Sequence, residues 1–543
     1  GKSVTLHAII TSLCMQYHPE ELELYLLDFK EGVEFQIYVD PYRDKNAKFD
    51  EELNDWKALP HAKLVSIESD REFGLSVLQR VQKEIENRGT LFKSSGVSNL
   101  DEYCRNNSES KLPRVLVVID EFQYMFQEND QITHQLNRIF EDITRRGRAF
   151  GVHLLIASQS PNVPNMSRGI YSFIELRMAM QMDQNTAGSV LAEGNTDAVD
   201  LLDRPGKLIY NIDYGRKGHN VIGQVVKATA EDAKLTLQEI HQFSIQNGYQ
   251  RSNPLVLFNG ILPTRLSQNG QLAHLHLKNN WLTPSALNKE ILSEPDWVPQ
   301  EFPCVAWLGE AMRVGDHTRA IFRRRARSNM LMIGSSEETI FGILGGMLIS
   351  LVHTCQPRQA EFYLLDLSQP TDEGDNYWTN LSPTFRESFS DYFPTLIGKR
   401  FPDPEQQVLR SESILHTVHA ELELRQQERE SNPDQLDFGP SVFFICAIGG
   451  LNRAQNLRPA VGLRGDEMSP DAKKFLQVVS QGAELGIHTI LWLDSTKTFL
   501  QLFADNRSAF NHFDLRIGPV SYTHLRAHET KTKLVCRLLL EKK

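Results

Sequence analysis

The sequence predicts an α/β protein with two tandem domains, each built around a mainly parallel, doubly wound sheet. Continuous apolar runs such as Val115–Ile119 are typical of parallel strands that are buried on both faces. In addition, Tyr25–Phe29 (YLLDF) returns as Tyr363–Leu367 (YLLDL), as expected when one domain pattern occurs twice.

The composition agrees with several globular domains, because 41% of the 543 residues are hydrophobic and 23% are charged. The net charge of −11 gives no overall basic field, so any contact with DNA needs a local basic patch. The six cysteines form no CxxC pair, which predicts neither a disulfide framework nor a zinc site and fits a reducing cytosol. The most apolar stretch, Thr339–Thr354, is shorter than the ~20 residues of a membrane span, and we expect a buried helix there.

The chain opens with Gly1-Lys2-Ser3, followed by apolar residues at helical spacing. These three residues end the GxxxxGK[ST] loop, in which backbone amides cradle phosphates, the lysine reaches the β- and γ-phosphates and the hydroxyl binds Mg²⁺. We therefore expect nucleotide to bind at Gly1, Lys2, Ser3 and Val4. Ser3 is a predicted metal ligand, and the chain is expected to begin inside the motif.

The strongest partner of this motif is Asp120-Glu121, which ends the apolar run that begins at Val115. At the C-terminal end of a parallel strand, Asp120 would hold Mg²⁺ and Glu121 would polarise the attacking water. A third apolar run ends at Gln159, whose amide suits a sensor of the γ-phosphate or of that water. A buried strand that happens to end in surface acids is the alternative interpretation.

A basic segment precedes this third strand and contains Arg145, Arg146 and Arg148. Arginines outside the phosphate loop can act as fingers that reach the nucleotide of a neighbouring subunit. Arg148 is our candidate catalytic arginine. A solvated basic helix face is the alternative for each of the three.

Over about residues 1–226, the ordered combination GKS, HPEELELYLLDFK, LPRVLVVIDEF, RRGRAFGVHLLIASQSP and DRPGKLIYN resembles the FtsK/SpoIIIE family of ring ATPases. The resemblance implies a P-loop NTPase (RecA-like) fold with ATP and Mg²⁺ as cofactors, and the internal repeat extends this fold to a second domain, which gives two tandem P-loop NTPase domains. It places Lys2 and Ser3 on phosphate and metal, Asp120 and Glu121 as Walker B acids, and Gln159 as sensor. Arg148 and Arg177 fall where the family has basic groups near the subunit boundary. A hexameric homo-oligomer at the cytoplasmic face of the cell membrane is also implied, with room for a membrane anchor upstream of residue 1.

The second copy keeps the pattern of strands but lacks the residues expected to bind phosphate and Mg²⁺ and to activate water. With the spacing of the YLLD repeat, Thr339, Ile340 and Phe341 replace Gly1, Lys2 and Ser3, while Gly334 takes the first glycine of the loop. Ala447 and Ile448 replace the two Walker B acids, Asp494 replaces Gln159, and Ala483 replaces Arg148. Without the lysine, several kcal/mol of electrostatic stabilisation of phosphate is lost. We therefore predict a catalytically dead P-loop domain.

The expected domains are an ATPase domain at 1–226, a linker and small sub-domain at 227–303, and the degenerate domain at 304–520. Residues 521–543 break from the preceding pattern and are expected to be a non-native tail. The basic run Arg323–Arg327 is interpreted as a solvated hairpin or subunit contact in preference to a nucleic-acid patch.

Two cargoes are compatible with such a motor. A DNA translocase is the default for the family and stands first. The alternative is a coupling ATPase of type VII secretion that moves protein substrates, because a live domain followed by a dead one looks like the EccC/EssC ATPases. In that case an apolar peptide would dock in a crevice near Ile340, Phe341 and Ile448. A regulatory scaffold without turnover is a third interpretation, against which Asp120-Glu121 argues.

Overall fold

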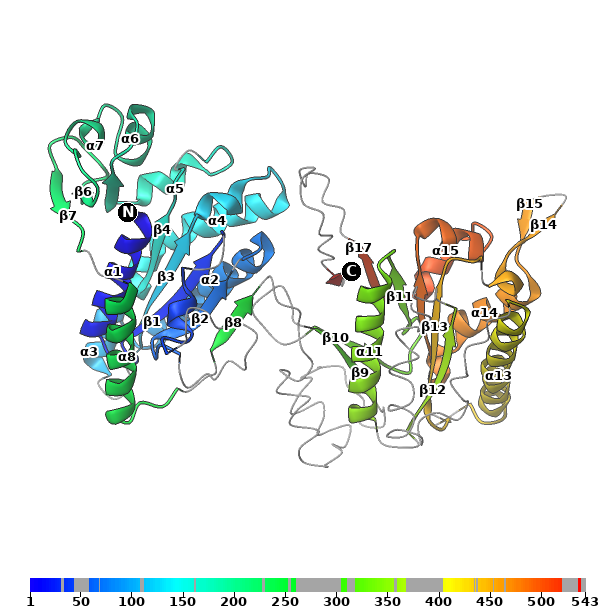
Figure 1. The fold of residues 1–543 in the computed structure, drawn as a ribbon. Helices are drawn as coiled ribbons and strands as arrows, with labels where there is room; N and C mark the ends of the chain where they lie inside the picture. The colour runs from blue at the N-terminus through cyan, green and yellow to red at the C-terminus, as the bar shows by residue number, and fades with distance from the viewer. Residues whose placement is uncertain are drawn as a thin grey trace. The chain divides into compact units, whose positions relative to one another are not determined.

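Figure 1 shows the fold in a computed structural model of the protein. The structure describes residues 1–30, 34–42, 58–67, 69–107, 112–160, 163–226, 230–251, 255–259, 304–309, 318–355, 359–367, 404–433, 435, 438–452, 454–462, 465–519 and 536–538. The chain divides into two compact units, one built on Gly1–Pro263 and the other on the residues from Thr264 onward, apart from Ala311–Gly315.

The first unit contains a five-stranded parallel sheet with the order β4–β3–β1–β2–β8. In that order the strands are Val152–Ala157, Arg114–Asp120, Leu22–Asp28, Ala62–Ile67 and Val256–Asn259. The register pairs Asp28 of β1 with Asp120 of β3, so both carboxylates end their strands at the same edge. Ligands of open α/β sheets bind at this edge.

Helices cover both faces of the sheet (Figure 1). They are α1 (Lys2–Gln16), α2 (Arg71–Ser94), α3 (Leu100–Asn106), α4 (Gln131–Arg146) and α8 (Ala230–Gln246). Leu27 and Ile119 pack with α2 and α4 on one face, whereas Leu26 and Val118 pack with α1 and α8 on the other. Because alternate strand residues point to opposite faces, both faces of the apolar strands are buried, as the sequence predicts.

The boundary expected at residue 226 differs from the structure. The predicted helical segment 231–245 forms α8, but α8 lies in the apolar core of the first unit through Leu237. After it, β8 pairs in parallel with β2 and extends the sheet. The first unit therefore continues through β8, and the rest of the predicted sub-domain, 260–303, lies outside the described residues.

A small antiparallel lobe follows the main sheet of the first unit. Its elements are β5 (Arg177–Met180), α6 (Gln184–Val190), α7 (Asp197–Asp200), β6 (Lys207–Asn211) and β7 (Asn220–Gln224), and the preceding α5 (Arg168–Phe173) places Ile170 in the main core. The strands pair in the order β5–β6–β7, and Ile209 and Leu191 are among the residues of its own small core.

The second unit repeats the architecture. Its sheet has the order β12–β13–β16–β11–β17–β18 and is parallel except for β18. The elements are β9 (Cys304–Gly309), β10 (Thr318–Phe322), β11 (Met330–Ile333), α11 (Glu337–Thr354), β12 (Ala360–Asp366), α13 (Pro404–Ser431), β13 (Ser441–Gly449), β14 (Ala460–Gly462), β15 (Gly465–Glu467), α14 (Pro470–Gln481), β16 (Ile487–Leu493), α15 (Thr496–Leu502), β17 (Leu515–Pro519) and β18 (Cys536–Leu538). α11 packs on one face, and α13, α14 and α15 pack on the other. The prediction of two doubly wound domains is thus confirmed.

The apolar stretch Thr339–Thr354 lies within α11, where Leu344, Met347 and Leu351 are buried in the core as predicted. In the described part of the chain, no helix combines the length and apolarity required to cross a bilayer. Of the expected tail 521–543, only β18 lies among the described residues, where it pairs with β17.

Candidate active site

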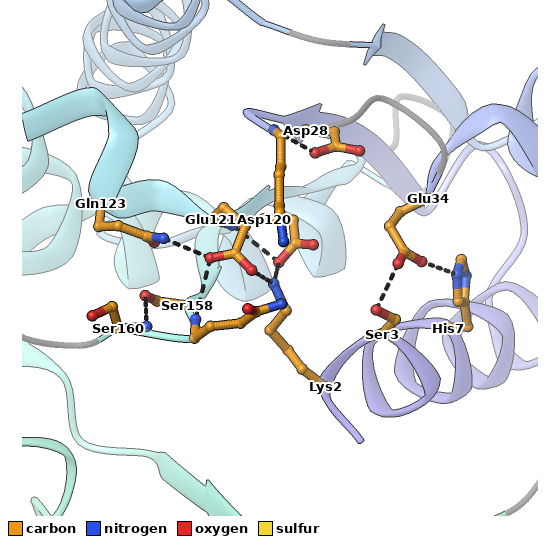
Figure 2. A network of polar contacts seen from close by, with 12 residues as sticks. Lys2, Ser3, His7, Asp28, Glu34, Asp120, Glu121, Gln123, Ser158 and Ser160 are labelled. Carbon is orange, nitrogen blue, oxygen red and sulfur yellow. Dashed lines mark hydrogen bonds and ion pairs between the residues drawn. The ribbon is translucent and has the colours of Figure 1, made fainter. Parts of the chain in front are cut away.

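The N-terminus of α1 points its lysine at the two acids that end β3 (Figure 2). Lys2 Nζ lies 2.5 Å from Asp120 Oδ1 and also contacts Glu121 Oε1. Only 17% of the Lys2 side chain is exposed, against 4% and 2% for the two acids. Lys2, Asp120 and Glu121, which lie far apart in the sequence, are therefore brought together as predicted.

Burial and charge set the protonation of this cluster. Burial raises the pKa of Asp120, although the Lys2 ammonium opposes the shift. Burial also acts against ionisation of Glu121, but hydrogen bonds from Lys2, Gln123 and the Gln159 backbone outweigh it and lower the pKa of Glu121. Burial likewise opposes the charge of Lys2, but its two acidic partners outweigh this and raise the pKa of Lys2. Glu121 is thus an ionised carboxylate beside a cation.

The backbone of Glu121 is strained. Its φ of 52° lies in the left-handed region, which a residue with a Cβ rarely adopts. Its N–H donates to Asp120 Oδ1 at 3.0 Å. Because the chain turns sharply here into the 3₁₀ helix Phe122–Phe126, both carboxylates end up at the strand edge. Strain of this kind is characteristic of functional sites.

A second cluster holds the predicted metal ligand Ser3. Its Oγ donates to Glu34 Oε1 at 2.7 Å, and His7 Nε2 lies 3.2 Å from Glu34 Oε2. The hydrogen bond to His7 lowers the pKa of Glu34 first of all, with a further contribution from Ser3. Asp28, buried at the end of β1, has its pKa raised by burial and by the charges of Asp120 and Glu34. The phosphate-loop edge is therefore rich in carboxylates (Figure 2).

This donor set fits Mg²⁺ bound together with phosphate. Among the described residues, no group of three or more His, Cys, Asp or Glu side chains forms a metal cage. Such a cage is not required, because a P-loop Mg²⁺ is held by one hydroxyl, a carboxylate and phosphate oxygens. Ser3 and Asp120 supply these groups at the same edge of the sheet, beside the ammonium of Lys2.

The other predicted nucleotide contacts lie on the first turn of α1 or beside it. Gly1 is its N-cap, and a Cβ there would come within 3.3 Å of Met180 Sδ, so the backbone is closely approached. Val4 lies in the first turn with 37% of its surface exposed. Gln159 reaches the cluster through its backbone N–H, which donates to Glu121 Oε2 at 3.2 Å, while its residue surface is exposed. Its sensor role stays a prediction.

The structure does not bring Arg148 to this site. Arg148 precedes β4, whereas the acids lie at the C-terminal ends of the strands, about 20 Å away at roughly 3.3 Å per residue. Its side chain is 88% exposed and lies 3.7 Å from Glu175. Arg177, in contrast, donates to the backbone carbonyls of Tyr171, Val190 and others and is part of the scaffold. Only Arg148 of these two is placed to reach another molecule.

Two further side chains belong to the site and are not predicted from the sequence. Gln123 donates through Nε2 to Glu121 Oε2 at 2.6 Å, and Glu34 holds Ser3. Gln123 follows the acid pair by two positions, which is the one signal that could have indicated it.

Comparison with known proteins identifies the domain that carries this geometry. The model of the FtsK/SpoIIIE family matches residues 1–43 and 47–216. The first unit carries an FtsK/SpoIIIE domain. This confirms the predicted P-loop ATPase family.

Relatives of the chain fall into two groups. The ESX secretion system protein EccC of Geobacillus thermodenitrificans is 22% identical over 393 residues, covering 67% of this chain and 24% of the relative. The DNA translocase FtsK of Bacillus anthracis is 29% identical over 222 residues, covering 39% of this chain and 25% of the relative. The chain thus spans about a quarter of the length of these relatives.

Solved structures share the tandem fold. The cytoplasmic domain of the Thermomonospora curvata type VII secretion ATPase EccC matches 95% of this chain with a TM-score of 0.58 at 18% identity, over 55% of that chain. EssC (ATPases 2 and 3) from Geobacillus thermodenitrificans matches 97% of this chain with a TM-score of 0.51 at 15% identity, over 85% of that chain. These likenesses establish the fold of both units.

In the second unit, aromatic rings occupy the positions of the FtsK/SpoIIIE site. The strand registers align Ala157 with Trp492 and Asp120 with Ala447. Trp492 Nε1 donates to the Gly334 carbonyl at 2.9 Å, and its ring packs edge-on against Phe341 with centroids 5.6 Å apart. The degenerate loop is thus held by Trp492 at the position of Ala157, and the ring packed against it, Phe341, stands at the position of Ser3.

The expected apolar crevice of the second unit differs from the structure. Ile340 and Phe341 are 2% and 3% exposed and belong to the apolar core that α11 forms with the sheet, so they do not line an open crevice. A cavity of about 720 Å³ does lie beside them, lined by apolar Ile448 and Trp492 but also by Arg458 and Asp494.

The basic run Arg323–Arg327 is partly folded inward. Arg323 is buried, Arg324 contacts the Gly439 carbonyl, and Arg327 pairs with Asp514 at 2.6 Å. These three side chains therefore do not form a free basic patch for DNA.

Proposed function

We propose that the chain is part of an ATP-driven motor that hydrolyses ATP in the first unit and moves a protein substrate. The observation that carries the ATPase part is the contact of Lys2 with both acids at the end of β3. A lysine at a helix N-terminus, opposite a buried Asp-Glu pair, is the arrangement that phosphoryl transfer to water requires.

The reaction follows from these residues. The free N–H groups of the first turn of α1 and the Lys2 ammonium bind the β- and γ-phosphates. Ser3 and Asp120 would hold a Mg²⁺ ion, whose charge would neutralise the phosphates. Glu121 accepts a proton from water, the water oxygen forms a bond to the γ-phosphorus, and the bond to the ADP oxygen breaks. Gln159 and Arg148 are proposed as sensor and as an arginine supplied to a neighbouring copy.

A protein cargo is favoured over DNA by the tandem arrangement. The EccC relative covers 67% of this chain, whereas the FtsK relatives cover 39%, which is less than the length of the first unit. The Thermomonospora curvata EccC structure with the same tandem fold (ATPases 2 and 3) was solved in complex with a signal sequence peptide. The net charge of −11 and the inward-turned arginines also give DNA little to bind.

The test compares two ligands on one chain that carries the complete GxxxxGK[ST] loop. A signal-type peptide is expected to bind the second unit and to change the ATPase rate, while duplex DNA leaves the rate unchanged. The Glu121→Gln variant is the control, because it removes turnover without touching the second unit. Stimulation by DNA that falls with salt, at about −0.9 in log–log slope per neutralised phosphate, would instead establish the DNA translocase.

The assembly is part of the same proposal. Because Arg148 is exposed and lies away from its own nucleotide site, a ring of copies, such as the predicted hexamer, is the arrangement that would use it. Location at the cytoplasmic face of a membrane is proposed for the same motor.

A further inference from the structure

The carboxylate of Glu121 is held from several sides. Gln123 Nε2 donates to Oε2 at 2.6 Å, and the Gln159 N–H donates to the same oxygen at 3.2 Å. The other oxygen, Oε1, contacts Lys2 Nζ. The two oxygens therefore have different partners: Oε2 is bound by groups at the strand edge, and Oε1 by the side chain that binds phosphate (Figure 2).

The amide of Gln123 is less favourable for the stability of the fold than an apolar side chain would be at this position. Its Oε1 atom is buried and has no hydrogen-bond partner among the described residues. A buried polar atom without a partner destabilises the fold, and an apolar side chain of the same shape would avoid that cost. The left-handed backbone of Glu121 adds a second local cost. Stability alone thus explains neither feature.

The second unit lacks the Walker B acids, and it also lacks both destabilising features, the unpaired buried amide oxygen and the strained non-glycine backbone. Carried along the aligned strands β3 and β13, Glu121 corresponds to Ile448 and Gln123 to Gly450. The left-handed residue lies one position further along, past an irregularity in the register of β13, and is Gly449, with φ 63°, a conformation that glycine adopts without strain. The carboxylate, the amide and the strained backbone are therefore absent together from the second unit, as expected if they serve one purpose.

We propose that Gln123 is a positioning residue that fixes Glu121 so that Oε1 is the oxygen that takes the proton from water. This inference rests on the proposed ATPase function. When phosphate draws the Lys2 ammonium away, Oε1 loses its partner while Oε2 stays bound to Gln123 and to the Gln159 N–H. The freed oxygen then faces the site in a fixed orientation, and the proton passes from water to Glu121 Oε1 as the oxygen–phosphorus bond forms.

The experiment replaces Gln123 by methionine, which is similar in length but cannot donate. In the chain with the complete phosphate loop, Gln123→Met is expected to lower kcat by about 10- to 100-fold, the cost of a misplaced catalytic group. The Kd for ATP should stay unchanged, whereas the Kd for ADP with fluoroaluminate, a transition-state analogue, should rise by a similar factor. Gln79→Met, at an exposed amide of α2, is the matched control and should change neither value.

Two outcomes would overturn the inference. One is a wild-type kcat in Gln123→Met, and the other is an equal loss of affinity for ATP and for the analogue, which would indicate a general loss of structure. If Gln123→Met does not fold, Gln123→Asn gives the same comparison, because the shorter amide cannot span the distance to Glu121. A parent chain that binds ATP without hydrolysing it would instead contradict the proposed function itself.

Discussion

At the residue scale, the site depends on one cation shared by two buried acids. Asp120 and Glu121 are almost fully buried, and Lys2 is their common partner. Removing one partner of a buried ion pair is costly, because the remaining charges stay desolvated and repel each other. Lys2 is therefore expected to have a structural role in addition to its proposed role in binding phosphate.

Lys2→Ala should lower the free energy of unfolding by about 3 kcal/mol at neutral pH. Without the ammonium, the folded-state pKa values of the two acids lie above their unfolded values, so this loss appears as pH rises above about 4 and is small below it. Urea unfolding at a series of pH values measures it. Lys83→Ala, at an exposed lysine of α2, is the control, and a pH-independent deficit in Lys2→Ala would contradict the assignment.

The residues that the sequence could predict are those whose spacing carries a motif. Lys2, Asp120 and Glu121 follow from the phosphate loop and from the strand that ends in acids. Gln123 and Glu34 are not predicted: the position of Gln123 two residues after Glu121 is the one signal in the sequence, and the partners of both side chains are set by how a 3₁₀ turn and a loop fold back on the strand edge. Arg148 follows a basic pattern, but the pattern does not say which edge of the sheet it lies on.

At the element scale, the two units differ in the side chains that contact the loop before the first helix. In the second unit the loop before α11 is bonded to Trp492 of β16, and Phe341 packs against the same ring. The strands of this unit were predictable from their apolar runs and from the YLLD repeat. The four-residue strand β8 was not, because such a short segment pairs with β2 only through the tertiary fold.

A chain whose first site is disabled should bind no Mg-ATP. In Lys2→Ala, the second unit offers Ile340, Phe341 and Ala447 where a lysine, a hydroxyl and an acid are needed. Isothermal titration calorimetry is expected to give no heat of binding for Mg-ATP. Micromolar binding in this variant would show that the second unit is a nucleotide site after all.

At the scale of the whole molecule, each unit contains a deeply buried histidine that must stay neutral to remain buried. Burial lowers the pKa of His61 in the first unit and of His488 in the second, in each case to about 4. Each ring is bonded to a backbone carbonyl, of Tyr17 or of Ser328. Both units are therefore expected to be sensitive to mild acid.

Because the unfolded histidines protonate near pH 6.5 and the folded ones only near 4, the unfolded state binds more protons between these values. Stability should be complete above this window and fall by about 3 kcal/mol for each histidine as pH drops through it. Thermal unfolding between pH 7 and 4 measures the loss. His488→Gln should reduce the pH dependence of the second unit alone, and an unchanged dependence would contradict the prediction.

In the proposed mechanism, Glu121 activates the water that hydrolyses ATP bound to the first unit. Single-turnover hydrolysis in the Glu121→Gln variant tests this role most directly. In a chain with the complete GxxxxGK[ST] loop, the variant should still bind Mg-ATP, because Lys2, Ser3 and Asp120 are untouched. Its rate of phosphate release should fall by at least ~10²-fold, since the interaction lost is one made in the transition state. Hydrolysis at the wild-type rate would contradict the account.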